Sequence, residues 1–329
     1  MSYFQPRIHQ MKRFLLPLLV LITLVVGCTK TGDPIDAQPK TVSDVLTETA
    51  SFSLMKAAIQ QAGLNDALKV ANLTVFAPTD DAFKAKGFST PESFKTISPE
   101  ALRNLLRYHL VSGIVTTKTP ELASASNLPV EASNTSTLFL TNTATVFSVN
   151  GSRVIKADQI VSNGVIHTIS TLLSAPSGDA VATLRNRADA GLLVAAITRA
   201  FIARPDLLAI LNGSTTNPNY KTITLFAPTD AAFTAAGYRT AADINAAAPA
   251  TLANLLSYHI VSGPIFSNQF QTSQLTTFNS STNNKVTIAV PASGPTVKGN
   301  SNATAATIKE TDIVSKNAVI HMIDQVLQP

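Results

Sequence analysis

A repeated pattern constrains this chain more than any other feature of its 329 residues. Three blocks occur twice, in the same order. The pairs are TVFAPTDDAF (74–83) with TLFAPTDAAF (224–233), YHLVSG (108–113) with YHIVSG (258–263), and IVSNGVIHTISTLL (160–173) with IVSKNAVIHMIDQVL (313–327). A long unit that is present only twice indicates domain duplication and not a solenoid. We therefore expect two homologous domains, residues 41–175 and 179–329, joined by the Pro/Gly/Ser segment SAPSGD.

The N-terminal stretch MKRFLLPLLVLITLVVGCTK has a short basic region followed by an apolar run. This run is shorter than the about 20 residues that a spanning helix needs, so it predicts a secretory signal peptide, residues 1–27. Its end, LVVGC, resembles the bacterial lipobox, which implies lipidation of Cys28 as the first mature residue. The alternative is that Cys28 is an ordinary residue at the end of a signal peptide. Residues 28–40 then form a flexible tether, and translation starts at Met1 or Met11.

The charge of the chain does not favour nucleic-acid binding. Of 25 basic residues, Arg7, Lys12 and Arg13 lie in the segment that precedes Cys28, and without them 22 basic residues face 20 acidic ones. No basic patch remains. Because Cys28 is the only cysteine, the domains must fold without disulfides.

Within each unit, helical patterns come first and strand patterns follow. Residues 53–68 carry a helical apolar stripe, and 74–77 is a short buried strand. A second helix starts after the capping residue Ser98, with Gly113 as its stop signal. Alternating residues after 137, with a hairpin turn at Asn150-Gly151, predict strands. The fold class is therefore α+β.

The capping position of the second unit differs in one respect. Ala248 stands where the first unit has Ser98. Because alanine offers no side-chain acceptor, we expect the helix after Ala248 to fray more at its first turn, by the worth of a cap, about 1 kcal/mol.

The three blocks resemble the signature segments of the fasciclin domain, and each recurs in the second unit. This resemblance implies a twisted β-sheet wedge with helices packed alongside, and a role in cell adhesion and matrix contact. In that family the tyrosine-histidine block has been linked to receptor contact. The candidate partner-binding residues implied here are Tyr108, His109, Tyr258 and His259.

The acidic residues of the first block have two interpretations. Asp80 and Asp81 could form a catalytic or metal-binding pair, or Thr79 and Asp80 could cap a helix after the strand. The second unit retains Thr229 and Asp230 but has Ala231 where Asp81 stands. A pair that chemistry required would be lost there, so the residues favour capping.

Histidines fall mainly in the repeated blocks. His109 and His259 lie on an apolar helical stripe, which is typical of neutral core histidines. Tyr108 and Tyr258 lie at the edge of that stripe, and we expect their hydroxyls to reach water or a partner. His167 and His321 follow apolar strand residues and have a structural role.

Metal and cofactor sites are not expected. A zinc site would require the fold to bring His109 and His167 together with further ligands, and the sequence offers no such cluster. Phosphate loops, dinucleotide fingerprints, catalytic elbows and zinc-protease motifs are absent from the sequence.

The sequence thus predicts a non-catalytic adhesion or binding module. A lipid anchor would hold it on the outer membrane or cell surface as a monomer that binds polysaccharide, matrix material or another envelope protein. One alternative is an envelope enzyme or small-molecule binder that acts on glycan through a His-centred site. Another is a structural spacer. An open cleft that exposes a histidine beside a carboxylate would favour the enzyme.

Overall fold

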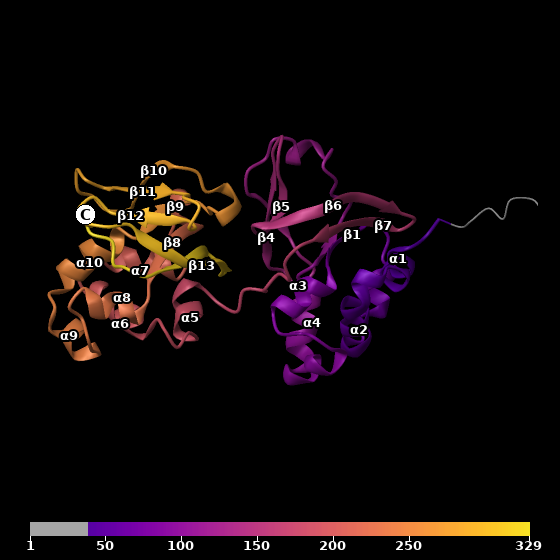
Figure 1. Ribbon diagram of the computed structural model, residues 1–329, viewed down its shortest axis with the longest axis horizontal. Coiled ribbons are helices and arrows are strands. Elements are labelled where there is room, and N and C mark those ends of the chain that lie inside the picture. The colour runs from indigo at the N-terminus through magenta and orange to yellow at the C-terminus, as the bar shows by residue number, and fades with distance from the viewer. Residues whose placement is uncertain (1–38) are drawn as a thin grey trace, which may run out of the picture. The chain divides into compact units, whose positions relative to one another are not determined.

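The computed structural model describes residues 39–329, which contain two domains of one architecture (Figure 1). The predicted signal peptide, most of the predicted tether and the lipidation candidate Cys28 lie outside the described residues. Among residues 39–329, no helix has the length and apolar character needed to cross a membrane.

Most helices of the first domain precede most of its strands, as the sequence predicts. Its helical elements are α1 (Val42–Glu48), η1 (Ala50–Phe52), α2 (Ser53–Ala62), η2 (Asn65–Lys69), α3 (Asp80–Ala85), η3 (Pro91–Thr96), α4 (Pro99–Arg107) and η4 (Pro120–Leu122). Its strands are β1 (Leu73–Pro78), β2 (Leu110–Ser112), β3 (Leu128–Glu131), β4 (Thr137–Asn142), β5 (Phe147–Val149), β6 (Ser152–Val161) and β7 (Gly164–Ile169). The α+β prediction is confirmed.

The second domain repeats this order. Its helical elements are α5 (Ala180–Arg185), α6 (Gly191–Ala200), α7 (Pro205–Leu211), η5 (Pro218–Tyr220), α8 (Asp230–Ala235), α9 (Ala241–Ala246), α10 (Pro249–Ser257) and η6 (Ser267–Gln269). Its strands are β8 (Ile223–Pro228), β9 (Ile260–Ser262), β10 (Ser273–Thr276), β11 (Lys285–Ala289), β12 (Thr296–Lys298), β13 (Ala306–Val314) and β14 (Ala318–Ile323).

Each domain has a barrel-like sheet of seven strands. The order is β2-β1-β7-β6-β5-β4-β3 in the first domain and β10-β11-β12-β13-β14-β8-β9 in the second. The first and third sequence blocks pair in parallel, with Leu73 opposite Gly164 and Ile223 opposite Ala318. In the second domain a bridge between Val261 and Thr277 joins the two ends of the sheet.

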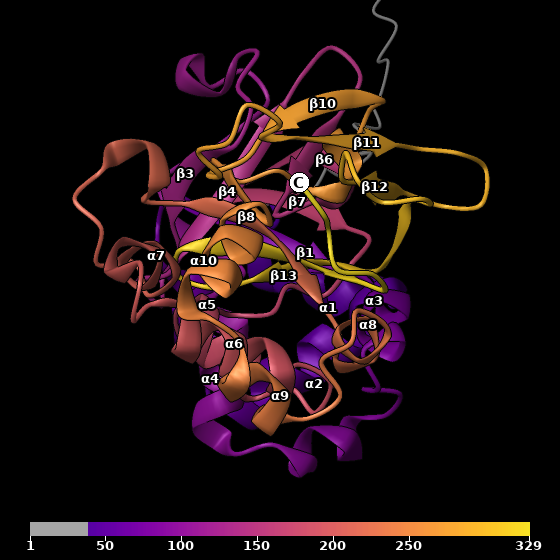
Figure 2. The same ribbon diagram turned by 90° about the vertical axis from the view of Figure 1, so that its left-hand side faces the viewer.

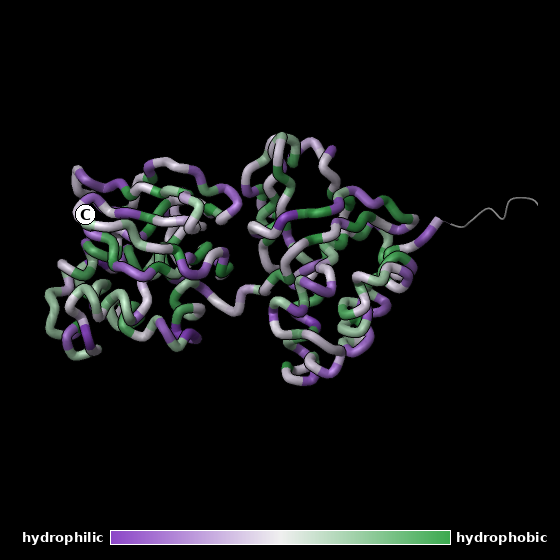
Figure 3. The backbone as a smooth tube through the Cα atoms, in the orientation of Figure 1, coloured by the Kyte–Doolittle hydropathy of each residue, from purple (hydrophilic) through white to green (hydrophobic). Residues whose placement is uncertain are grey.

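The strand of the first block, β1 in one domain and β8 in the other, is buried on both faces. In β1, Val75 and Ala77 pack into a core cluster with the helices, whereas Phe76 packs into a second cluster inside the sheet. In β8, Leu225 packs into the cluster with the helices and Phe226 into the cluster inside the sheet. This explains why these strands appear as continuous apolar runs without alternation. The α-helices of each domain gather on one side of its sheet (Figure 1 and Figure 2), and apolar segments occur in both domains (Figure 3).

The helix predicted over 53–68 is shorter than expected. It ends at Ala62 because Gly63 adopts the left-handed conformation, with φ of 67°, and its N–H caps the preceding turn. The following residues form the short η2 helix. The hairpin turn predicted at Asn150-Gly151 is confirmed, since Val149 pairs with Ser152 across it.

The second predicted helix also ends early. Ser98 caps α4 as expected, but the helix stops at Arg107, so the prediction that it extends to Gly113 was wrong. Leu110–Ser112 instead forms β2, which pairs with β1 and places Leu110 opposite Val75. Pairing with a buried strand outweighs the helical periodicity of these residues.

Candidate functional site

The first block places two capping residues on two different helices. Thr79 Oγ1 accepts a hydrogen bond from the N–H of Ala82 in α3, at 3.3 Å. The next residue, Asp80, caps α2 instead: its Oδ1 accepts from the N–H of Leu54 at 2.8 Å and its Oδ2 from the hydroxyl of Ser53 at 2.7 Å. The block thus fixes the strand end to two helix N-termini.

The second domain repeats this double cap. Thr229 accepts from the N–H of Ala232 at 3.3 Å, and Asp230 from the N–H of Leu192 at 2.7 Å. In the first domain Asp81 is exposed and pairs only with Lys84, at 3.2 Å. The carboxylates of Asp80 and Asp81 therefore serve different partners and do not form a catalytic or metal-binding pair.

Tyr108 lies inside the first domain. The side chain is fully buried, and its hydroxyl donates to the carbonyl of Thr137 at 2.9 Å and accepts from the amide of Asn150 at 2.7 Å. Burial raises the pKa of this phenol above its ordinary value. The prediction that the tyrosine hydroxyl reaches water or a partner was wrong.

His109 is fully buried and uses both ring nitrogens. The N–H of Leu173 donates to Nε2 at 3.1 Å, so the proton is on Nδ1, which donates to the carbonyl of Leu105 at 2.9 Å. Burial lowers its pKa from 6.5 to about 4, because the charged ring would lose its hydration. This histidine is neutral and joins the end of α4 to the segment after β7.

The second domain reproduces both arrangements. His259 donates to the carbonyl of Leu255 and accepts from the N–H of Leu327, each at 2.9 Å, and its pKa is lowered to about 4 by burial. Tyr258 is fully buried and donates to the carbonyl of Lys285. None of the four predicted partner-binding side chains, those of Tyr108, His109, Tyr258 and His259, is accessible.

His167 has the opposite tautomer. The N–H of Asp158 donates to its Nδ1 at 3.1 Å, and its Nε2–H donates to the carbonyl of Val115 at 2.8 Å. Its ring stacks on Phe76, with centroids 5.3 Å apart, and meets Phe147 edge-on. Burial lowers the pKa of His167, although the Val115 carbonyl acts in the opposite direction.

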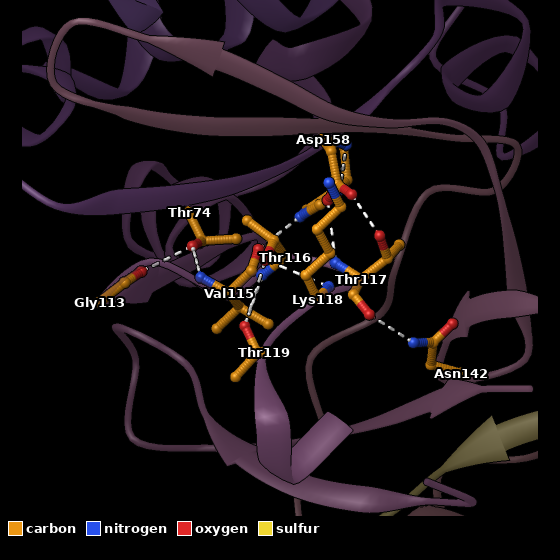
Figure 4. Close-up of polar contacts among 10 residues, drawn as sticks. Thr74, Gly113, Val115, Thr116, Thr117, Lys118, Thr119, Asn142 and Asp158 are labelled. Atoms are coloured by element: carbon orange, nitrogen blue, oxygen red, sulfur yellow. Dashed lines mark hydrogen bonds and ion pairs between the residues drawn. The ribbon is translucent and has the colours of Figure 1, made fainter. Parts of the chain in front are cut away.

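Asp158 anchors a polar network around this histidine (Figure 4). Its backbone is left-handed, with φ of 55°, and its carboxylate accepts from the N–H of Thr117 at 3.0 Å and from the Thr117 hydroxyl. The Thr117 carbonyl accepts from the Asn142 amide at 2.9 Å. Thr74 Oγ1 accepts a hydrogen bond from the N–H of Val115 at 2.9 Å. The network holds the segment after β2 against β1 and β6.

The second domain contains the matching network. The N–H of Asp312 donates to His321 Nδ1 at 3.3 Å, and His321 Nε2–H donates to the carbonyl of Ile265 at 2.9 Å. The carboxylate of Asp312 accepts from the N–H of Ser267 at 2.7 Å, and Thr224 Oγ1 receives the N–H of Ile265 at 2.8 Å. Burial lowers the pKa of His321.

These histidines have no free nitrogen for a metal ion or for proton transfer. His109 and His167 each use both ring nitrogens for backbone groups, so neither offers a nitrogen for the zinc arrangement that the sequence left open. No group of three or more His, Cys, Asp or Glu side chains in the part of the chain that the structure describes could hold a metal ion.

Sequence reasoning missed the partners of these side chains. Asp158 and Asp312 each stand nine residues before a motif histidine, and this identical spacing could have identified them. Asn163 and Asn317 lie inside the third block and bind the start of each domain, through the N–H groups of Val42 and Ala180. Their signal was weak because asparagine beside a turn is common.

The comparisons with known proteins agree with this duplicated architecture. A model of the fasciclin domain matches residues 50–176 and 196–329. The chain is 37% identical over 143 residues to transforming growth factor-beta-induced protein ig-h3 of Sus scrofa, a match that covers 42% of this chain and 20% of that protein. It is 36% identical over 140 residues to protein sll1483 of a Synechocystis strain, covering 41% of this chain and 74% of that protein.

One solved structure that the chain matches is the FAS1 domain pair from the insect cell adhesion molecule fasciclin I. It covers 84% of this chain and 96% of its own, with 17% sequence identity and a TM-score of 0.38. The family assignment rests on the sequence model, which matches each half of the chain separately and together covers well over half of it. This protein therefore belongs to the fasciclin domain family and carries two fasciclin domains in tandem.

Proposed function

We propose that this chain is a non-catalytic adhesion or binding module of the cell envelope, held at a membrane by a lipid on Cys28. Its partner is a polysaccharide, matrix material or another envelope protein. One observation carries the proposal: the tyrosines and histidines of the signature blocks are all buried and hydrogen-bonded inside their own domain. The blocks build the fold, which leaves binding to the outer surfaces.

The same observation supports the absence of catalysis. A general base must reach the proton that it abstracts, directly or through one water. His109 and His259 are fully enclosed and have pKa values lowered to about 4, so neither can exchange protons with a bound substrate without unfolding its surroundings. The alternative of a His-centred enzyme receives no support from the described residues.

Two domains on one chain also suit weak surface binding. When two modest sites can engage one extended partner, the second binding event is intramolecular and the overall affinity rises. A polymer such as a polysaccharide presents repeated sites of this kind. Duplication would therefore strengthen binding without requiring a deep pocket in either domain.

The binding proposal is tested with the chain from Thr29 onward on immobilised envelope polysaccharide and envelope protein. We expect saturable retention by the parent and by the Tyr108→Phe and Tyr258→Phe variants, because each loses only a buried hydroxyl. Circular dichroism checks that the variants are folded. If folded variants lose retention, the tyrosine-histidine block is a contact surface and our interpretation is wrong. Cleavage of the polysaccharide by the parent would instead support the enzyme.

The anchor is tested in the full chain. We expect Cys28→Ala to move the protein from the membrane fraction to the soluble fraction and to abolish labelling by a fatty-acid analogue, since several acyl chains bind a membrane strongly. Thr29→Ala is the matched control and should change neither result. Continued membrane association of the Cys28→Ala variant would contradict lipid anchoring.

A further inference from the structure

At the matching place of the first domain Lys40 and Ser162 line a recess of ≈ 360 Å³, and the second domain has a larger one. Its volume is ≈ 700 Å³, within the about 300–1,000 Å³ that is typical of ligand sites. Three segments line it: the start of the domain at 178–182, the loop at 212–221, and the β13–β14 turn at 316–317.

An insertion creates the outer wall of this recess. The connection from α6 to β8 comprises residues 201–222, 22 in all, whereas the connection from α2 to β1 comprises residues 63–72, 10 in all. The longer connection adds α7 and the loop that follows it. The wall that this connection supplies is therefore an addition to the shared fold and not a part of its core.

Asn317 holds the three segments together. Its Oδ1 accepts from the N–H of Ala180 at 2.9 Å, and its amide donates to the carbonyls of Ile210 at 2.8 Å and Leu211 at 3.1 Å. Gly213 lies against it with φ of 75°, and a Cβ there would lie 3.1 Å from Asn317 Cβ. The walls are therefore fixed before any ligand arrives.

The charge of this recess differs from that of the smaller one, whose Lys40 pairs with Glu48. Lys221 and Lys316 line it, and neither forms an ion pair with a carboxylate among residues 39–329. The registers of β1 with β7 and of β8 with β14 place Ala71 and Ser162 at the matching positions of the first domain. Asp179 is the one carboxylate of the lining.

The other polar groups of the lining suit a polyhydroxylated ligand. Asp179 uses Oδ1 to cap α5, at 2.8 Å from the N–H of Ala182, and has further lone pairs available as acceptors. Asn212 uses its carbonyl oxygen for the N–H of Ser214, at 3.0 Å, and its amide nitrogen bonds to no group within the described residues. Thr215 adds a hydroxyl.

We propose that this recess binds a uronic acid residue of an acidic polysaccharide. Lys221 and Lys316 pair with the sugar carboxylate, while Asp179, Asn212 and Thr215 bind its hydroxyls. This inference rests on the proposed binding function and names the ligand class of one domain. Because both ammonium groups are near the surface, the binding is weak and decreases with salt.

The test is an NMR titration of the chain from Thr29 onward with trigalacturonate at low salt. We expect saturable amide shifts confined to 178–182, 212–221 and 315–317, and weaker binding when the salt is raised. The double variant Lys221→Ala/Lys316→Ser, which installs the residues of the first domain, should bind about tenfold more weakly. The control Lys285→Ala should bind like the parent, and neutral maltotriose should bind much more weakly.

Three outcomes would overturn the proposal: shifts that lie elsewhere, a double variant that binds like the parent, or inorganic phosphate that binds as tightly as trigalacturonate. The last would show that the recess recognises any anion and not a sugar acid. Failure of the uronic-acid proposal can be distinguished from failure of the proposed binding function. A chain that is retained on envelope material but gives no shifts at this recess remains a binding module without this site.

Discussion

Acid should destabilise both domains before their carboxylates titrate. The cause is the pair of fully buried histidines His109 and His259, whose pKa values are lowered from 6.5 to about 4 by burial. The folded state keeps each ring neutral, and the unfolded state binds a proton near pH 6.5. The stabilisation is therefore complete above pH 6.5 and is lost as the pH falls from there towards 4.

The size of the effect follows from the pKa difference. A shift of about 2.5 units at about 1.36 kcal/mol each gives about 3 kcal/mol for each histidine, of which about 2 kcal/mol is already lost at pH 5. A domain of this size is stable by about 5–15 kcal/mol, so the loss is a substantial fraction. His167 and His321, whose pKa values are also lowered, act in the same direction.

The measurement compares the parent with His109→Gln between pH 7.5 and 5. Glutamine can donate to one backbone group and accept from another, but it does not titrate. Denaturant unfolding is followed by pulsed hydrogen exchange and mass spectrometry, which reads peptides of each domain separately. We expect the variant to lower the stability of the first domain at pH 7.5 and to reduce its pH dependence by about 2 kcal/mol.

The second domain is the internal control, because it retains His259 and should keep the pH dependence of the parent. If the first domain of the variant loses stability with acid as steeply as the parent, His109 is not the titrating group. If neither domain of the parent loses stability between pH 7.5 and 5, the argument from buried neutral histidines is wrong.

Further substitutions test three structural roles. Asp80→Ala should lower the stability of the first domain by about 1–2 kcal/mol in thermal or denaturant melts, because it removes the cap of α2. Asp81→Ala should leave the melts unchanged, and a larger loss for Asp81→Ala than for Asp80→Ala would contradict the assignment of Asp80 as the cap. Ala248→Ser should stabilise the second domain by about 1 kcal/mol and slow amide exchange in the first turn of α10, which has no side-chain cap; unchanged exchange would contradict this. Asn317→Ala should cost the second domain about 3 kcal/mol or more, since three backbone groups lose a partner, and a loss below 1 kcal/mol would show that water replaces them.

Local features that one segment encodes were predictable. The turn at Asn150-Gly151, the cap at Ser98 and the buried strand after residue 72 each follow from residue types within a few positions. The structure of segments that pair with distant parts of the chain was not predictable. YHLVSG has helical spacing, yet its last residues pair with β1, and nothing local to them encodes that pairing.

The residues of the candidate site were also predictable only in part. The sequence identified His109 as a core residue from its apolar spacing, and the structure buries it. It placed the Tyr108 hydroxyl at the surface, because a helical wheel cannot show that Asn150 and Thr137 arrive from strands to cover it. Periodicity describes one element alone, whereas burial depends on what packs against that element.

By itself, the sequence determined the duplication, the family and the order of helices and strands, because these are recorded in repeated blocks and local periodicity. Only the tertiary structure decided what the marked residues do. It assigns Thr79 and Asp80 to different helices, and it satisfies both nitrogens of each motif histidine with backbone groups, at least one of which is remote in the chain. Hydrogen-bond partners and recesses are formed by segments that meet only after folding, so no local pattern records them.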